Sequence, residues 1–286
     1  MTFKEIFKVL PQYLLPQHLL SAWMSKLTHS EIPALKNCLI KTVIRIYGAD
    51  LSEAKHQDLT AYPSFNDFFT RELEQNARPI SNIENAIVSP ADGVVSQAGS
   101  ISGGRIFQAK NHDYSIVELL GGDENLGKTF ENGSFATIYL SPKDYHRLHM
   151  PVSGVLKQML HIPGKLFSVN QTTVNAVPGL FARNERVVCI FESQSGPFAM
   201  ILIGAIFVSS IETIWHGVVT PPSVLTPRSW SYHDTALKLE KGLEMGRFNM
   251  GSTVIVLFAG DQSQWNETFK AGLPIKLGEM IGYLQD

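Results

Sequence analysis

The chain of 286 residues has only two cysteines, no long apolar run and little net charge. Cys38 and Cys189 lack the spacing of a disulfide framework or a metal site, so we expect two buried free thiols and a reducing compartment. No apolar stretch reaches the roughly 18 residues that a membrane span needs, and no signal peptide is visible. The formal net charge of -2 offers no general attraction to nucleic acid. These absences favour a cytoplasmic protein that does not bind nucleic acid.

Positive charge is nevertheless concentrated near the N-terminus. Residues 1–48 carry six basic and two acidic side chains, and they are also rich in large apolar residues. Pro11 and Pro16 are expected to divide this stretch into short pieces. Amphipathic pieces that combine lysine with tryptophan, phenylalanine or leucine suit the surface of an anionic membrane. Packing of the same faces on the protein core or on a second subunit is the alternative interpretation.

Two helices are easier to place. Apolar residues recur at three- and four-residue spacing between Leu35 and Ile46, and Gly48 supplies a stop. Farther along, Ser64 and Asp67 have the spacing of a capping box at the start of a short helix. Arg78 and Pro79 then end the helical part, so we expect residues 1–80 to form a helical region.

From about Ala86 the pattern changes to short strand-like runs separated by Gly, Pro, Asn and Asp. The clearest runs are Val94–Val95, Phe135–Leu140, Val155–Ile162, Val187–Phe191, Met200–Ile203 and Thr253–Phe258. Because no long helices separate these runs, we predict an α+β fold in which residues 81–286 form a mostly antiparallel β catalytic core.

The chemistry centres on Gly251 and Ser252, which directly precede the last of these runs. A serine that follows glycine can attack the carbonyl carbon of its own preceding residue, because glycine tolerates a strained backbone. The attack replaces the amide by an ester. Removal of the serine α-proton then expels the upstream chain and leaves dehydroalanine, which becomes a pyruvoyl group after tautomerisation and loss of ammonia. An ordinary strand start is the alternative for these residues alone.

A serine attack needs a base, and histidine is the side chain that is available near neutral pH. His146 and His149 lie in the polar segment 141–151, which interrupts two strand-like runs and is therefore predicted to be a loop. A solvated turn or a pair of metal ligands is the alternative, but no convincing third and fourth ligand is present, so no metal is expected. Asp92 could orient a histidine, although Asp-Gly is often only a turn.

Taken together, these motifs resemble the phosphatidylserine decarboxylase family, in its bacterial, membrane-associated type. The resemblance covers nearly the whole chain. It runs through residues 64–69, Arg78-Pro79, 90–93, 145–151, 164–170, 181–186, 208–213, 244–246 and 251–253. Two departures are Met250, where Leu or Val is usual, and Asn111, where many members have Gly.

The resemblance implies roles for individual residues. Asp92, His149 and Ser252 match the self-processing triad, in which Asp92 orients His149 and His149 deprotonates Ser252. Cleavage between Gly251 and Ser252 would yield a β chain of residues 1–251 and an α chain of residues 252–286, which remain associated as a heterodimer. His146 matches a proton donor in decarboxylation, and Ser168 matches a residue that contacts substrate.

The same resemblance implies the substrate and cofactor. The pyruvoyl group derived from Ser252 would form a Schiff base with the amine of phosphatidylserine and take up the electrons left by carbon dioxide, giving phosphatidylethanolamine. Since the acyl chains stay in the bilayer, the protein is expected on the cytoplasmic side of the cell membrane as a peripheral protein. A higher oligomer is left open.

Two other classes of protein fit parts of the sequence. The first is a serine hydrolase that uses Asp92, His149 and Ser252 as a conventional triad, but the chain has no Gly-x-Ser-x-Gly elbow. The second is a non-enzymatic membrane-binding module in which the β region only supports the N-terminal apolar faces. Cleavage of the chain and decarboxylase activity would distinguish both from the enzyme.

Overall fold

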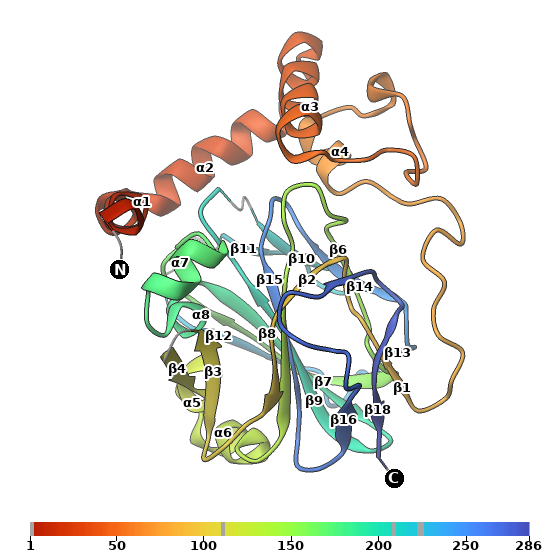
Figure 1. Cartoon of the computed structure of the whole chain (residues 1–286). Coiled ribbons are helices and arrows are strands. Elements are labelled where there is room, and N and C mark those ends of the chain that lie inside the picture. The colour runs from red at the N-terminus through yellow and green to blue at the C-terminus, as the bar shows by residue number, and fades with distance from the viewer. Residues whose placement is uncertain (1–2, 110–111, 208–209, 222–225, 286) are drawn as a thin grey trace.

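The computed structural model describes residues 3–109, 112–207, 210–221 and 226–285. A group of helices stands at one end of a large β structure (Figure 1), so the prediction of an α+β fold is confirmed. The helices are α1 (Phe3–Leu14), α2 (Gln17–Thr28), α3 (Pro33–Tyr47), the 3-10 turn η1 (Leu59–Ala61), α4 (Phe65–Phe69), α5 (Ile116–Leu119), α6 (Glu124–Phe130), α7 (Gln171–Ala176) and α8 (Leu180–Arg183).

The strands of the described residues pair antiparallel throughout, as the sequence predicts. They are β1 (Ala86–Val88), β2 (Gly93–Ser100), β3 (Arg105–Ala109), β4 (His112–Ser115), β5 (Ser134–Tyr139), β6 (Arg147–His149), β7 (Gly154–Ile162), β8 (Arg186–Ser193), β9 (Gly196–Ile203), β10 (Ile211–Thr213), β11 (Gly217–Thr220), β12 (Arg228–Ser231), β13 (Lys238–Leu239), β14 (Glu244–Phe248), β15 (Thr253–Phe258), β16 (Ser263–Trp265), β17 (Pro274–Ile275) and β18 (Met280–Leu284).

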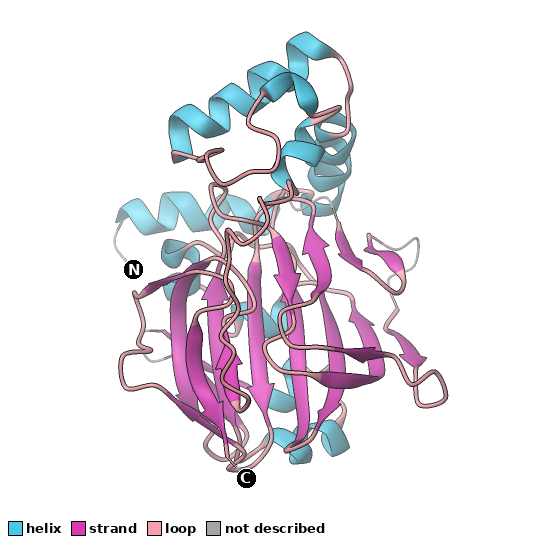
Figure 2. Cartoon of the chain, turned by 90° about the vertical axis from the view of Figure 1, so that its right-hand side faces the viewer, coloured by secondary structure: helices cyan, strands magenta, loops and turns pink. Residues whose placement is uncertain are grey.

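The largest sheet has nine strands in the order β12-β7-β8-β9-β15-β5-β2-β17, with β13 also paired to β7. Smaller sheets join β11-β10-β14-β6, β1-β18-β16 and β3-β4. Figure 2 shows the strands of the main sheet running toward the N-terminal helices. Five of the six predicted strand-like runs lie wholly in strands of this sheet, and the sixth, Phe135–Leu140, extends one residue beyond β5, so these predictions are confirmed to within one residue.

β15 lies near the middle of the main sheet, between β9 and β5, and all six of its residues are buried. Val254, Val256 and Phe258 belong to the hydrophobic core on one face, whereas Ile255 and Leu257 belong to the core on the other. Successive side chains of a strand point to opposite faces, so a strand that is covered on both sides is apolar at every position. This is why the run is uninterrupted in the sequence.

Two predicted helix boundaries in the N-terminal region are confirmed, the end of α3 and the start of α4. α3 ends at Gly48, whose φ of 72° places it in the left-handed conformation that glycine adopts readily. Ser64 and Asp67 form the capping box of α4. Pro16 separates α1 from α2, but Pro11 lies inside α1 and does not divide it, which corrects the expectation of two breaks. The bounds of the predicted helix at Leu35–Ile46 fall within α3.

The outer face of α1 and α2 is strongly apolar. Leu14 is 84% exposed and Trp23 is 67% exposed, and other large apolar side chains beside them are also uncovered, namely Leu10, Tyr13, Leu15 and Leu19. None of the helices in the described parts of the chain combines the length and apolarity needed to cross a membrane. Both cysteines are free, but Cys38 is exposed on α3, whereas only Cys189 is buried as expected.

Candidate active site

Ser252 occupies the turn between β14 and β15. It is fully buried, and its carbonyl oxygen accepts a hydrogen bond from the Leu140 amide at 2.9 Å. Its hydroxyl group has no hydrogen-bond partner among the described residues. A buried hydroxyl without a partner is unfavourable in a folded protein. The Ser252 hydroxyl is therefore not committed to a structural hydrogen bond.

The backbone before Ser252 is strained at Met250 rather than at Gly251. Met250 has a φ of 109°, a value that side-chain-bearing residues rarely adopt, while Gly251 does not have a positive φ. The side chain of Met250 packs against a small aromatic cluster of the helical region that includes Phe65 and Phe69. This departure from the family pattern therefore lies where the helical region meets the cleavage segment. The other departure, Asn111, lies outside the described residues, as do Val208 and Ser209.

His146 is the histidine that the structure places beside Gly251. Its Nε2 atom lies 3.5 Å from the position that a Cβ atom would have on Gly251. Its Nδ1 atom donates to the Asp144 carbonyl oxygen at 2.8 Å, so Nε2 is the unprotonated nitrogen, and Nε2 has no partner in the described structure. Burial lowers the pKa of His146 to about 3, and the positive charge of Arg71 acts in the same direction. His146 is therefore a neutral acceptor at physiological pH.

His149 belongs to β6 and not to a loop, which corrects the predicted position of this residue. Its Nδ1 atom donates to the Gly242 carbonyl oxygen at 2.8 Å, and its Nε2 atom accepts from the Tyr145 hydroxyl at 3.1 Å. Burial lowers the pKa of His149, against the effects of the Gly242 hydrogen bond and of the Glu244 charge. His149 therefore has the tautomer of a general base, but Tyr145 occupies its basic nitrogen. Both side chains line a cavity of about 370 Å³.

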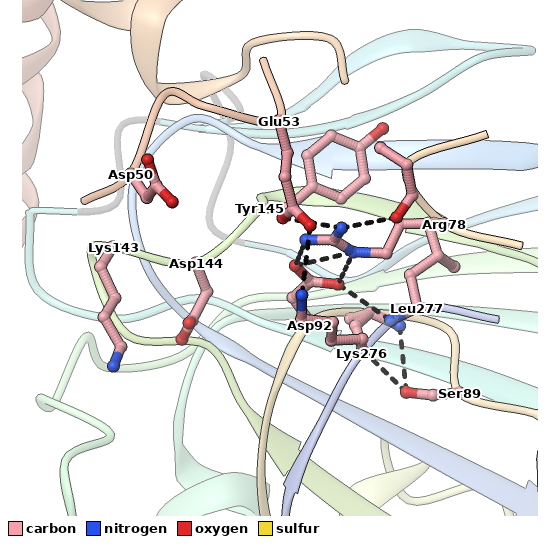
Figure 3. A network of polar contacts seen from close by, with 12 residues as sticks. Asp50, Glu53, Arg78, Ser89, Asp92, Lys143, Asp144, Tyr145, Lys276 and Leu277 are labelled. Atoms are coloured by element: carbon pink, nitrogen blue, oxygen red, sulfur yellow. Dashed lines mark hydrogen bonds and ion pairs between the residues drawn. The ribbon is translucent and has the colours of Figure 1, made fainter. Parts of the chain in front are cut away.

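Asp92 directly precedes β2 and is only 7% exposed. Its Oδ1 atom accepts from Arg78 Nε at 2.9 Å and from the Leu277 amide at 2.8 Å, while its Oδ2 atom accepts from Arg78 Nη2 at 2.6 Å. Figure 3 shows the guanidinium group of Arg78 between Asp92 and Glu53. Arg78 Nη1 forms an ion pair with Glu53 Oε2 at 2.9 Å. Within the described structure Asp92 has no hydrogen bond to His146, His149 or Ser252.

Ser168 lies in the connection between β7 and α7. Its amide donates to Gln12 Oε1 at 2.8 Å, and its hydroxyl accepts from the Asn170 side chain at 2.7 Å. The connection reaches the end of β9 through Asn184, whose side-chain nitrogen donates to the carbonyl oxygens of Phe167 and Gly204. Gly204 follows Ile203, which pairs with Thr253. Ser168 and Ser252 thus belong to segments that meet at the same end of the sheet.

Three polar residues of the site received no role from the sequence. Arg78 binds Asp92, and Tyr145 binds His149. Arg71 is 5% exposed, and its Nε and Nη1 atoms have no partner among the described residues, while Nη2 donates to the Lys143 carbonyl oxygen at 3.1 Å. The signal that the sequence offers for Arg71 is a charged residue two positions after the last phenylalanine of α4. In the described residues no cluster of three or more His, Cys, Asp or Glu side chains could hold a metal ion.

The fold and the site define an α+β protein with buried serine and histidine groups at the start of a central strand. A family model described as phosphatidylserine decarboxylase matches residues 65–283, and a second, described as PSD, matches residues 7–48. The chain therefore belongs to the phosphatidylserine decarboxylase family.

Three bacterial relatives illustrate the similarity, and each carries the name phosphatidylserine decarboxylase proenzyme. The protein of Pseudomonas fluorescens is 52% identical over 281 residues, which are 98% of this chain and 97% of that protein. The protein of Bordetella avium is 52% identical over 282 residues, which are 98% of this chain and 96% of that protein. The protein of Methylococcus capsulatus is 52% identical over 271 residues, which are 95% of this chain and 94% of that protein.

Proposed function

We propose that this chain is a phosphatidylserine decarboxylase that cleaves itself between Gly251 and Ser252. Its family membership supports the activity, and the word proenzyme in the names of its relatives supports the processing. The observation that carries the assignment to these residues is the hydroxyl of Ser252 at the start of β15, which has no partner among the described residues, with His146 Nε2 next to Gly251. A serine hydrolase is not favoured, because the serine starts a strand instead of a strand-to-helix elbow.

In the proposed processing, Ser252 Oγ attacks the carbonyl carbon of Gly251 and gives its proton to a base. The peptide C–N bond breaks, and an ester joins Gly251 to the Ser252 side chain. Loss of the Ser252 α-proton then expels Gly251 as a carboxylate and leaves dehydroalanine at position 252. Tautomerisation to the imine and hydrolysis by water yield the pyruvoyl ketone and ammonia. The positive φ of Met250 adds strain that cleavage would release.

Asp92, His149 and Ser252 are proposed as the processing triad. The unprotonated Nε2 atom and the lowered pKa of His149 suit a base that is neutral at physiological pH. For the triad to form, His149 Nε2 must release the Tyr145 hydroxyl and accept a hydrogen bond from the Ser252 hydroxyl instead. Asp92 must also turn toward His149 while it keeps part of its binding to Arg78. His146 is proposed for the decarboxylation step. Because its pKa in the uncleaved chain is about 3, it must first gain a proton at Nε2 before it can donate one.

The pyruvoyl group fits a strand start at which the hydroxyl is buried and makes no hydrogen bond in the described structure. When present, it supplies a carbonyl that takes up the electrons left behind as carbon dioxide departs. The protein residues then bind the serine headgroup and exclude water from it. Ser168 is proposed to contact the substrate, and phosphatidylethanolamine is the proposed product.

The enzyme is proposed to work as a peripheral protein on the cytoplasmic side of the cell membrane. The exposed apolar side chains of α1 and α2, including Leu14 and Trp23, support this location, together with the six basic side chains of residues 1–48. An anionic lipid surface is the proposed partner of this face. The α and β chains are proposed to stay together, because β15 is paired along its whole length to β9 and β5.

Mass measurement under denaturing conditions tests the proposal. We expect a larger chain that ends at Gly251 and a smaller chain that begins at position 252 with a blocked N-terminus. The same preparation should decarboxylate phosphatidylserine in vesicles. The Ser252→Ala variant should remain one chain and release no carbon dioxide. Decarboxylase activity from an uncleaved chain with an unmodified Ser252 would contradict the proposal.

A further inference from the structure

α1 and α2 present two chemically different faces. Their outer face carries the exposed apolar side chains Leu14, Leu19 and Trp23. Apart from Val9, the buried side chains described on their inner face are polar, namely Gln12, Gln17, Ser21 and Thr28. Gln17 and Ser21 are both 5% exposed and lie one helical turn apart on this inner face. Polar side chains that are buried this deeply usually have specific hydrogen-bond partners, and here the partners lie in the segment that carries Ser168.

The inner face binds the backbone of residues 164–168, here called the serine loop. Gln12 Oε1 accepts from the Ser168 amide at 2.8 Å, and Gln17 Oε1 accepts from the Leu166 amide at 2.7 Å. His18 Nε2 donates to the Gly164 carbonyl oxygen at 2.9 Å. The two glutamines are also joined, since Gln17 Nε2 donates to the Gln12 carbonyl oxygen at 2.7 Å.

A second loop at the same end of the sheet is held in the same way. Ser21 Oγ accepts from the Phe207 amide at 3.2 Å. Aromatic contacts reinforce the junction, because Tyr13 packs edge-on against Phe167 at 4.9 Å and the Arg183 guanidinium lies 5.1 Å from the Phe167 ring. Helices α1 and α2 thus contact both segments that lie near the start of β15.

These hydrogen bonds make two amides of the serine loop, those of Leu166 and Ser168, depend on the helices, whereas Lys165 and Phe167 are held by residues 183–185. The amides of Leu166 and Ser168 are satisfied by side chains of α1 and α2, so departure of the helices would leave both amides unpaired or exposed to water. Asn184 connects the loop to Gly204, next to the residue that pairs with Thr253. A change in the position of α1 and α2 would therefore alter the contacts of the segment next to Ser252.

We propose that Gln12 and Gln17 are positioning residues that couple contact with a lipid surface to the shape of the serine loop. This inference rests on the proposed function, in which α1 and α2 meet the membrane and Ser168 meets the substrate. A lipid surface that binds the outer face holds the helices in place, and the helices then hold the loop in its substrate-binding shape. Such coupling is reciprocal, so a ligand on the loop also stabilises the helices.

The test separates lipid contact from substrate supply. The mature enzyme is given dibutanoyl-phosphatidylserine as dispersed monomers, with or without vesicles of phosphatidylcholine and phosphatidylglycerol, which are not substrates. We expect these vesicles to raise kcat/KM by about fivefold or more, the lower end of typical coupling between sites. The Gln12→Ala/Gln17→Ala variant should self-cleave and sediment with the vesicles, yet show no such increase.

Two further variants complete the design. Gln171→Ala is the matched control, because the side chain of this exposed glutamine bonds to Asn175 within α7 and to no other described residue, and the variant should respond to vesicles like the wild type. Gln17→Glu keeps an acceptor for the Leu166 amide and should retain part of the response. If the double variant does not fold, the single Gln17→Ala variant takes its place, with the same loss of response expected.

Hydrogen exchange gives an independent measure. Vesicles should slow exchange at the amides of Leu166 and Ser168 in the wild type but not in the double variant. Equal stimulation of the wild type and the double variant, or a wild type that does not respond to vesicles, would overturn the coupling. A wild type that never decarboxylates the substrate would instead refute the proposed function.

Discussion

The guanidinium group of Arg78 binds both carboxylate oxygens of Asp92, with Nη2 2.6 Å from Oδ2 and Nε 2.9 Å from Oδ1. These hydrogen bonds are the main reason that the pKa of Arg78 is raised above its ordinary value. Arg78 also binds Glu53, and Glu53 binds Lys276 at 3.2 Å. One ion-pair network (Figure 3) thus connects the helical region, the proposed triad and the segment downstream of the cleavage site.

Replacing Arg78 should destabilise the protein. The measurement uses the Ser252→Ala background, which is expected to stay one chain. There, Arg78→Met should lower the free energy of unfolding by about 3 kcal/mol, because the buried charge of Asp92 loses its ionic partner. Urea unfolding measures this change. Arg105→Met is the control, since the Arg105–Asp113 pair is exposed and should contribute less than about 1 kcal/mol. Equal losses in the two variants would show that the buried pair has no special importance.

The two histidines should have separable effects. His149→Ala should block self-cleavage, whereas His146→Ala should cleave and then lose about 10²–10⁴-fold in decarboxylation, the usual contribution of a general acid. Intact mass follows the first reaction and carbon dioxide release the second. His233→Ala, at an exposed position, should leave both unchanged. Because His146 lies beside Gly251, loss of cleavage in His146→Ala with normal cleavage in His149→Ala would exchange the two roles.

Tyr145 should restrain the proposed base. Its hydroxyl donates to His149 Nε2, the atom that must receive the serine proton, and burial raises the pKa of Tyr145, so that it stays a neutral donor. Tyr145→Phe removes this competing hydrogen bond and should speed self-cleavage by about fivefold, equivalent to roughly 1 kcal/mol. The rate is read from the disappearance of the uncleaved chain after synthesis. A slower reaction would mean that Tyr145 takes part in proton transfer.

The stability of the uncleaved chain should fall in acid. The pKa of His146 is about 3 when folded and near its ordinary value when unfolded, so the unfolded state binds the extra proton between these limits. The contribution of neutral His146 to the free energy of unfolding is therefore fully present above about pH 6.5. As the pH falls from there toward 3, the free energy of unfolding decreases by on the order of 1 kcal/mol per pH unit. Urea unfolding of Ser252→Ala at several pH values measures the slope. Adding His146→Leu should reduce this slope, and an unchanged slope would contradict the assignment.

Local features of the fold were predictable because their causes lie within a few residues. Gly48 ends α3 through its own backbone freedom, and Ser64 and Asp67 cap α4 through bonds that span three residues. The run at Thr253–Phe258 is apolar because both faces of β15 are covered. In each case the signal and the structure occupy the same stretch of chain.

The arrangement of the site was less predictable, since it depends on contacts between distant segments. Density of polar residues predicts a loop at His149, but pairing with Glu244 places it on β6. Nothing near Asp92 indicates that Arg78 and the amide of Leu277 bind it. The exposure of Cys38 likewise depends on which face of α3 meets the protein, and the apolar neighbours in its sequence do not determine that face.

The central position of β15 has a consequence for the order in which the enzyme must be assembled. A strand that is bonded on both sides cannot be inserted into a finished sheet, because its two neighbours would first have to separate. The smaller product of the proposed cut therefore has to enter the fold while it is still part of the precursor. Synthesised separately and added later, it would have no edge to join, and a damaged copy could be replaced only by making the whole protein again.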